Sequence, residues 1–120
     1  MTEKSMLIIV LNRVELLDKM LSALNANGIK GATILNSMGM AHELGIMQED
    51  SYYIGSLRAL FGVSHKESRT IFMVIDNDRI IDATQVIDEV IDLQQPDTGI
   101  LFAIPVLFAA GIPEAKKKED

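Results

Sequence analysis

Two histidines and a glutamate in the central part of this chain could bind a metal ion. His42 and Glu43 are adjacent, and His65 follows later in the same segment. Imidazole and carboxylate groups hold zinc or copper when three or more of them converge. The chain has no close ligand spacing such as His-x-x-x-His. The pattern favours solvated loop residues over a metal centre, and a site made by His42 and His65 stays open as an alternative.

Carboxylates are concentrated in one later stretch, where a pair could act as general acid and base. They fall in a turn or at solvent-facing positions of an amphipathic helix: Asp76, Asp78, Asp82, Asp88, Glu89 and Asp92. The chain also contains no cysteine. It has neither a recognisable nucleophile with its base nor a GxxxxGK phosphate loop. We predict that the protein is not an enzyme.

Two glycines mark loops that could border a binding site. The residues Asp97-Thr98-Gly99 are typical of a turn, and the apolar run Ile100–Val106 that follows them predicts a buried strand. Pro105 cannot donate to a sheet ladder, so we expect it at an edge or where the strand leaves the sheet. Gly39 closes an earlier strand. Junctions of this kind from neighbouring subunits can face one another across an interface cleft.

The first half of the chain has the pattern of a strand, a helix and a strand. The apolar run Met6–Leu11 predicts a central strand, and Asn12 is the candidate cap of the helix behind it. Gly31–Ser37 predicts the second strand. The helix ends at Asn27-Gly28, and apolar residues at helical spacing mark its buried face: Val14, Leu17, Met20, Leu21 and Leu24.

The second half repeats this order. Arg69–Ile75 predicts a strand, and Asp76-Asn77-Asp78 predicts a turn and a helix cap. The helix ends at Gln94-Gln95-Pro96, and its apolar face is Ile80, Ala83, Ile87, Val90 and Ile91. The apolar run after Gly99 is the last strand.

The long segment from Met40 to Ser68 separates the two halves. Connections of this length are usually functional or mobile. Within it, Ser51–Phe61 predicts a short amphipathic helix. We expect three of its side chains to contact a partner protein: Tyr53, Leu57 and Phe61.

Together these elements predict an α+β fold, the ferredoxin-like βαββαβ sandwich. Its antiparallel four-stranded sheet carries two helices on one face and a long loop between strands 2 and 3. We predict a single domain over residues 1–113, with the loop excursion at 40–68, and a charged, frayed tail at 114–120. Because the strands are apolar on both faces, we expect copies of the chain to cover the face without helices.

Composition limits the classes of partner. The formal net charge of −6 argues against nucleic acid, whose phosphates require a basic face. The longest uncharged stretch contains prolines and glycines and is shorter than a membrane span, so we expect no membrane insertion. The absence of cysteine is compatible with the cytoplasm, where we expect the protein to act.

Three segments resemble the nitrogen regulatory PII family, which belongs to a wider group with the copper-tolerance protein CutA. Gly28–Ile34, GIKGATI, is similar to the family's GIxGxTV segment, and Asp97–Val106, DTGILFAIPV, is similar to its GDGKIFVLPV run. Gly39–Glu43, GMAHE, occupies the place of its GxGRQ loop base. The resemblance covers both halves outside the central loop, and its last strand is the most specific part.

The resemblance implies a function in signal transduction. PII proteins are homotrimers that bind ATP or ADP in clefts between subunits, with 2-oxoglutarate at the loop base. Their long loop docks onto transporters, enzymes or regulators. The implied effector is an adenine nucleotide, and the implied partner is a membrane transporter or a regulatory protein. The cleft residues expected here are Thr33, Gly39, Ala41, His42, Glu43, Asp97, Thr98 and Gly99.

The chain differs from the family where phosphate is bound. Ile100 stands in place of a lysine, Glu43 in place of a glutamine, and Phe108–Pro113 in place of an arginine pair. Losing these cations removes charge-assisted contacts to a triphosphate, which favours a less charged effector. The alternative by resemblance is a CutA-like trimer that binds divalent metal through His42 and His65.

Overall fold

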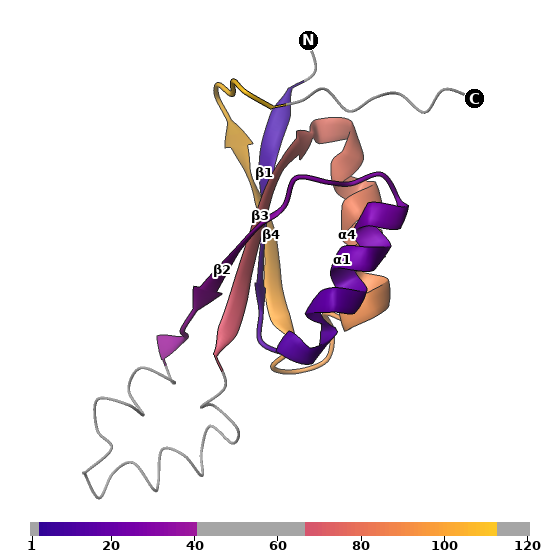
Figure 1. The fold of residues 1–120 in the computed structure, drawn as a ribbon, viewed down its shortest axis with the longest axis vertical. Coiled ribbons are helices and arrows are strands. Elements are labelled where there is room, and N and C mark those ends of the chain that lie inside the picture. Colours follow the sequence, from indigo (N-terminus) through magenta and orange to yellow (C-terminus); the bar gives the residue numbers. More distant parts are fainter. Residues whose placement is uncertain (1–2, 41–66, 113–120) are drawn as a thin grey trace, which may run out of the picture.

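The computed structural model describes residues 3–40 and 67–112, which form one antiparallel sheet with helices on one side (Figure 1). The spatial order of the strands is β2-β3-β1-β4, and all neighbours are antiparallel. This confirms the predicted α+β, ferredoxin-like arrangement. Its elements are β1 Lys4–Leu11, α1 Leu17–Ala26, β2 Thr33–Ser37, β3 Ser68–Asp76, α4 Ile80–Ile91 and β4 Gly99–Val106.

The core lies between the sheet and the two helices of the described chain. Alternate residues of a strand point to the same face, and the register places Leu7 opposite Met73 and Ile9 opposite Ile71 on the helix side. Helical spacing brings matching apolar side chains down onto them. The residues buried in this core are Leu7, Ile9, Leu11, Met20, Leu24, Ile29, Ile71, Met73, Ile75, Ala83, Ile87 and Ile91.

The start of the first helix differs from the sequence prediction. Asn12 does not cap it: the chain first makes a 3₁₀ turn at Val14–Leu16, and no side chain caps either turn or helix. The Asn12 backbone N–H instead donates to the Thr98 carbonyl at 2.9 Å. The prediction was wrong because this residue ties the end of β1 to the turn before β4.

The second helix also differs at both ends. A 3₁₀ turn at Asn77–Arg79 precedes α4, and Asp76 makes no side-chain cap bond. Its carboxylate accepts a hydrogen bond from the Lys4 ammonium at 2.6 Å. The helix ends at Ile91, before the predicted Gln94-Gln95-Pro96, because Asp92 adopts a left-handed φ of 51°.

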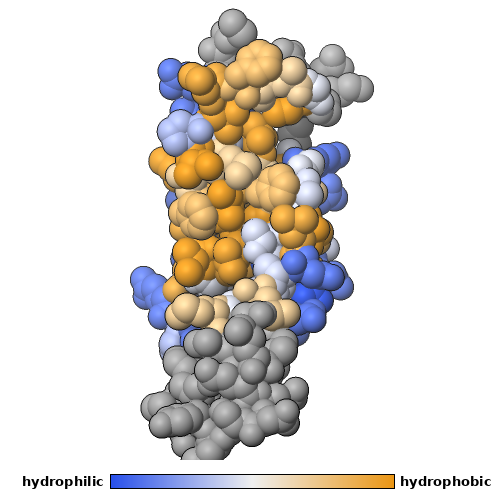
Figure 2. All heavy atoms as spheres, turned by 90° about the vertical axis from the view of Figure 1, so that its left-hand side faces the viewer, coloured by the Kyte–Doolittle hydropathy of each residue, from blue (hydrophilic) through white to orange (hydrophobic). Residues whose placement is uncertain are grey.

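The sheet face opposite the helices is apolar, and no described helix covers it (Figures 1 and 2). Ile100, Phe102 and Ile104 of β4 are 62%, 45% and 43% exposed there. We call this surface the apolar sheet face. By register its apolar residues are Met6, Ile8, Val10, Leu35, Phe72, Val74, Ile100, Phe102, Ile104 and Val106.

Several predictions concern residues outside the described ranges. These are the helix at Ser51–Phe61, the charged tail, and the side chains Ala41, His42, Glu43, Tyr53, Leu57, Phe61 and His65. Pro105 lies in the edge strand β4, as predicted. No helix in residues 3–40 and 67–112 has the length and apolarity to cross a membrane.

Candidate functional site

The register places the two predicted halves of the site at the same end of the sheet. Gly99 pairs with Leu11, Leu11 with Arg69, and Arg69 with Asn36, so these residues form one row across the strands. Gly39 follows β2 just beyond this row. Strands β2 and β4 are the opposite edges of the sheet, about 14 Å apart at roughly 4.8 Å per strand. A single chain therefore does not bring Gly39 and Gly99 together.

Thr33 belongs to the β2 edge as well. It pairs with Phe72 and lies exposed on the apolar sheet face, level with Phe102 of the far edge. Of the predicted cleft residues that the structure describes, Thr33 and Gly39 thus lie at one edge. Asp97, Thr98 and Gly99 lie at the other edge.

The turn before β4 is held by its own bonds. Thr98 is 1% exposed, and its hydroxyl donates to the Gln95 carbonyl at 3.0 Å. Gly99 approaches β1 so closely that a Cβ would stand 2.5 Å from the Val10 carbonyl oxygen. Asp97 is exposed with a left-handed φ of 60°. In one chain, Thr98 and Gly99 shape this edge, and the exposed Asp97 side chain is within reach of a ligand.

Arg69 is a cation in this row that was not among the predicted site residues. Its side chain is 26% exposed and lies 3.5 Å from the Glu67 carboxylate. The same guanidinium donates to the Ser68 carbonyl at 3.1 Å. Arginine binds carboxylates and phosphates through several donors at once. Its position in the row depends on the register, which no local pattern reveals.

Three hydroxyl groups gather on the apolar sheet face where β2 meets β3. The Ser37 and Ser68 hydroxyls lie 2.7 Å apart, and the Thr70 hydroxyl donates to Ser37 at 2.8 Å. Ser68 is 3% exposed. We call these residues the hydroxyl cluster. No local sequence pattern indicates this cluster, because its members come from strands that are far apart in the chain.

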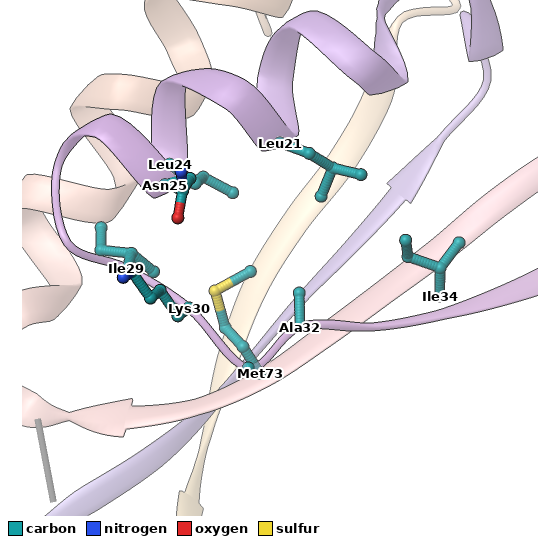
Figure 3. A pocket seen from close by; sticks show the side chains of 9 residues that line it. Leu21, Leu24, Asn25, Ile29, Lys30, Ala32, Ile34 and Met73 are labelled. Carbon is teal, nitrogen blue, oxygen red and sulfur yellow. The ribbon is translucent and has the colours of Figure 1, made fainter.

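A pocket of about 290 Å³ opens between α1 and the start of β2 (Figure 3). Leu24, Ile29 and Met73 are the buried residues that line it. Ile34 of the edge strand lies at the other side and is 42% exposed. The pocket exists because neither described helix packs fully under the β2 edge. Leu24 was predicted on the buried face of the first helix, and Ile34 and Met73 in strands, but no opening between these elements was predicted.

The described part of the chain does not include the residues of the proposed metal site. In residues 3–40 and 67–112, no three His, Cys, Asp or Glu side chains are grouped so that they could hold a metal ion. His42 and His65, which the alternative requires, lie outside those ranges.

No protein-family model matches the sequence, and no curated protein matches it significantly. Solved structures do match. The Arabidopsis thaliana PII protein bound to citrate has a TM-score of 0.62 and 17% identity, over 88% of this chain and 78% of that one. The B. subtilis GlnK–ATP complex has a TM-score of 0.60 and 16% identity, over 88% and 84%. The chain has a PII-like fold.

A further match has no known function. This protein from Pediococcus pentosaceus ATCC 25745 has a TM-score of 0.65 and 10% identity, over 93% of this chain and all of that one. Together the matches confirm the fold that the motif resemblance implied. In this PII-like chain, Ile100, where the family places a lysine, is 62% exposed on the apolar sheet face. A hydrophobic side chain thus occupies that position beside the turn.

Proposed function

We propose that this PII-like chain is a non-catalytic regulatory protein. It assembles as a homotrimer, binds a small effector in clefts between subunits, and regulates a partner protein through residues 40–68. The observation that carries this proposal is the separation of the two site halves on opposite edges of the sheet. A cleft lined by both halves forms only when the β4 edge of one copy meets the β2 edge of another.

The apolar sheet face supports the assembly part of the proposal. Phe102 and Ile104 lie at its β4 side with close to half of their surface in water. Contiguous apolar surface of this kind marks interaction sites, because burying it is favourable by about 25 cal/mol per Å². Copies that face one another across this surface remove it from water and bring their edges together.

We propose an adenine nucleotide with few phosphates as the effector class. Two of the matching structures are a PII protein bound to citrate and a GlnK–ATP complex. Arg69 can supply one cation at the level of the cleft, whereas Ile100 supplies none. An anion of low charge suits one guanidinium better than a triphosphate, which in the PII family contacts several cations.

The partner is proposed by resemblance to be a membrane transporter or a regulatory protein, contacted in the cytoplasm by Tyr53, Leu57 and Phe61. Tyr53→Asp or Leu57→Asp should abolish recovery of the partner in a pulldown while the assembly persists in sedimentation. Unchanged recovery by both variants would remove the loop from the proposal.

The effector proposal is tested by calorimetry on the purified protein. ATP, ADP, AMP and cyclic adenine nucleotides are titrated with and without magnesium and 2-oxoglutarate. We expect saturable binding of AMP or a cyclic nucleotide at three per trimer, and weaker binding in Arg69→Gln than in Lys19→Gln, an exposed control on α1. If none of these nucleotides binds, the proposal of an adenine nucleotide effector is refuted.

The same calorimetry tests the CutA-like alternative, in which the protein binds a divalent metal. Copper or zinc is titrated into the unsubstituted protein and into His42→Ala. Stoichiometric metal binding that His42→Ala abolishes would favour that alternative over the nucleotide effector.

A further inference from the structure

Two consecutive apolar side chains project from the end of β4. Leu107 is 103% exposed and Phe108 is 82% exposed, so the rest of the described chain barely contacts them. Scattered exposed apolar residues are ordinary, but an adjacent leucine and phenylalanine directly after a strand form an anchor of the kind that fills a partner's pocket. We call this pair the hook.

The pocket under the β2 edge is a matching acceptor. Its buried lining, Leu24, Ile29 and Met73, is apolar, and its volume of about 290 Å³ suits apolar side chains better than a large ligand. In Figure 3 the side chains of Ile34 and Leu21 stand on either side of the opening, on β2 and α1. Lys30 also lines the pocket and is exposed.

The hook and the pocket cannot meet within one chain. The hook continues from β4, whereas the pocket lies under β2, and two other strands separate these edges. A contact between different surfaces of identical subunits is heterologous, and it is satisfied for every copy when the subunits close into a ring. Such a ring uses each hook and each pocket once.

We propose that Leu107 and Phe108 of one copy insert into the pocket of the next copy, beneath its β2 edge. This inference rests on the proposed homotrimer and names the contact that closes its edges. The occupant is a second copy because each chain carries both complementary parts, and the apolar sheet face extends across the strands from the β4 edge to the β2 edge. The tail at 114–120 is a poor occupant, since it carries charged residues including Lys116-Lys117-Lys118.

Cross-linking tests the contact directly, since the chain has no cysteine of its own. Phe108→Cys is combined with Ala32→Cys in the pocket lining. Under mild oxidation we expect disulfide-linked dimers and trimers on a denaturing gel, because inserted side chains bring the two Cβ atoms into bonding range. The control pairs Ala32→Cys with Ile81→Cys, a residue that is 70% exposed on α4, and should stay uncross-linked.

A mixing experiment tests the head-to-tail geometry. Phe108→Asp removes the hook and Ile34→Asp damages the pocket, and each should raise the concentration for half-assembly about tenfold or more. An equimolar mixture should assemble at a lower concentration than either variant alone, because intact hooks meet intact pockets. Ile81→Asp is the surface control and should assemble like the unsubstituted protein.

The outcomes separate this inference from the proposed function. A trimer that forms without the specific cross-link, with both variants assembling normally, overturns the insertion and leaves the trimer standing. An unsubstituted protein that sediments as a monomer overturns both. Loss of small-molecule binding in Ile34→Asp, with assembly unchanged, would make the pocket a ligand site and overturn the insertion.

Discussion

Adding one methyl group at Gly99 should destabilise the fold by about 1.5–4.5 kcal/mol. A Cβ on Gly99 would stand 2.5 Å from the Val10 carbonyl oxygen, about 1 Å short of ordinary contact. The start of β4 must therefore move away from β1. That movement strains the packing by about 1–3 kcal/mol. It also weakens the 2.9 Å hydrogen bond from the Asn12 N–H to the Thr98 carbonyl, worth about 0.5–1.5 kcal/mol.

Urea unfolding followed by circular dichroism measures this loss for Gly99→Ala, at one fixed chain concentration because assembly contributes to stability. Gly39→Ala is the matched control at the other half of the site. A Cβ on Gly39 would have no described atom within 4 Å, and its φ is not positive, so the free energy of unfolding should change by less than about 0.5 kcal/mol. Equal midpoints and slopes for the two variants would refute the steric argument.

Three further predictions concern stability. Ile87→Ala should lower the free energy of unfolding in urea by about 2–5 kcal/mol, because Ile87 is fully buried. Ile81→Ala on the same helix should change it by less than about 0.5 kcal/mol, because Ile81 is exposed. Similar losses for the two variants would contradict the orientation of the helix. Thr98→Val should cost about 1–3 kcal/mol, since it leaves a carbonyl without its donor; a neutral result would show that water replaces the hydroxyl. A double-mutant cycle with Lys4→Met and Asp76→Asn should give a coupling of about 1 kcal/mol or less, because both side chains are partly exposed; a coupling above about 2 kcal/mol would contradict that estimate.

Much of the fold could be predicted because its signals are local. The apolar run at Met6–Leu11 and the helical spacing of Ile80, Ala83 and Ile87 each identify an element without reference to the rest of the chain. The alternation of strand and helix then restricts the topology through right-handed crossovers. The uncovered face followed from strands that are apolar on both sides.

The failures arose where distant residues decide the local conformation. Asparagine is a common helix cap, but the backbone N–H of Asn12 donates a hydrogen bond to the carbonyl of Thr98, which is far away in the sequence. Asp76 was expected in a cap, and its carboxylate instead contacts Lys4 on the neighbouring strand. Local propensity gives way to these tertiary bonds.

Only some residues of the candidate site could be predicted from the sequence. Motif resemblance pointed to Gly39 and Gly99, yet the distance between the two edges and the cation at Arg69 depend on strand order and register. The pocket under β2 depends on how far the helices extend across the sheet. A single sequence contains no direct signal for either.

The hydroxyl cluster has a consequence for the alignment of the short strand β2. Four of its five residues are exposed, so burial does little to choose its register. Sliding β2 by two residues along β3 would keep each side chain on its face. Only one alignment places the Ser37 hydroxyl between those of Ser68 and Thr70. These bonds therefore act as a positional reference, fixing the point at which the chain leaves the sheet toward residue 41.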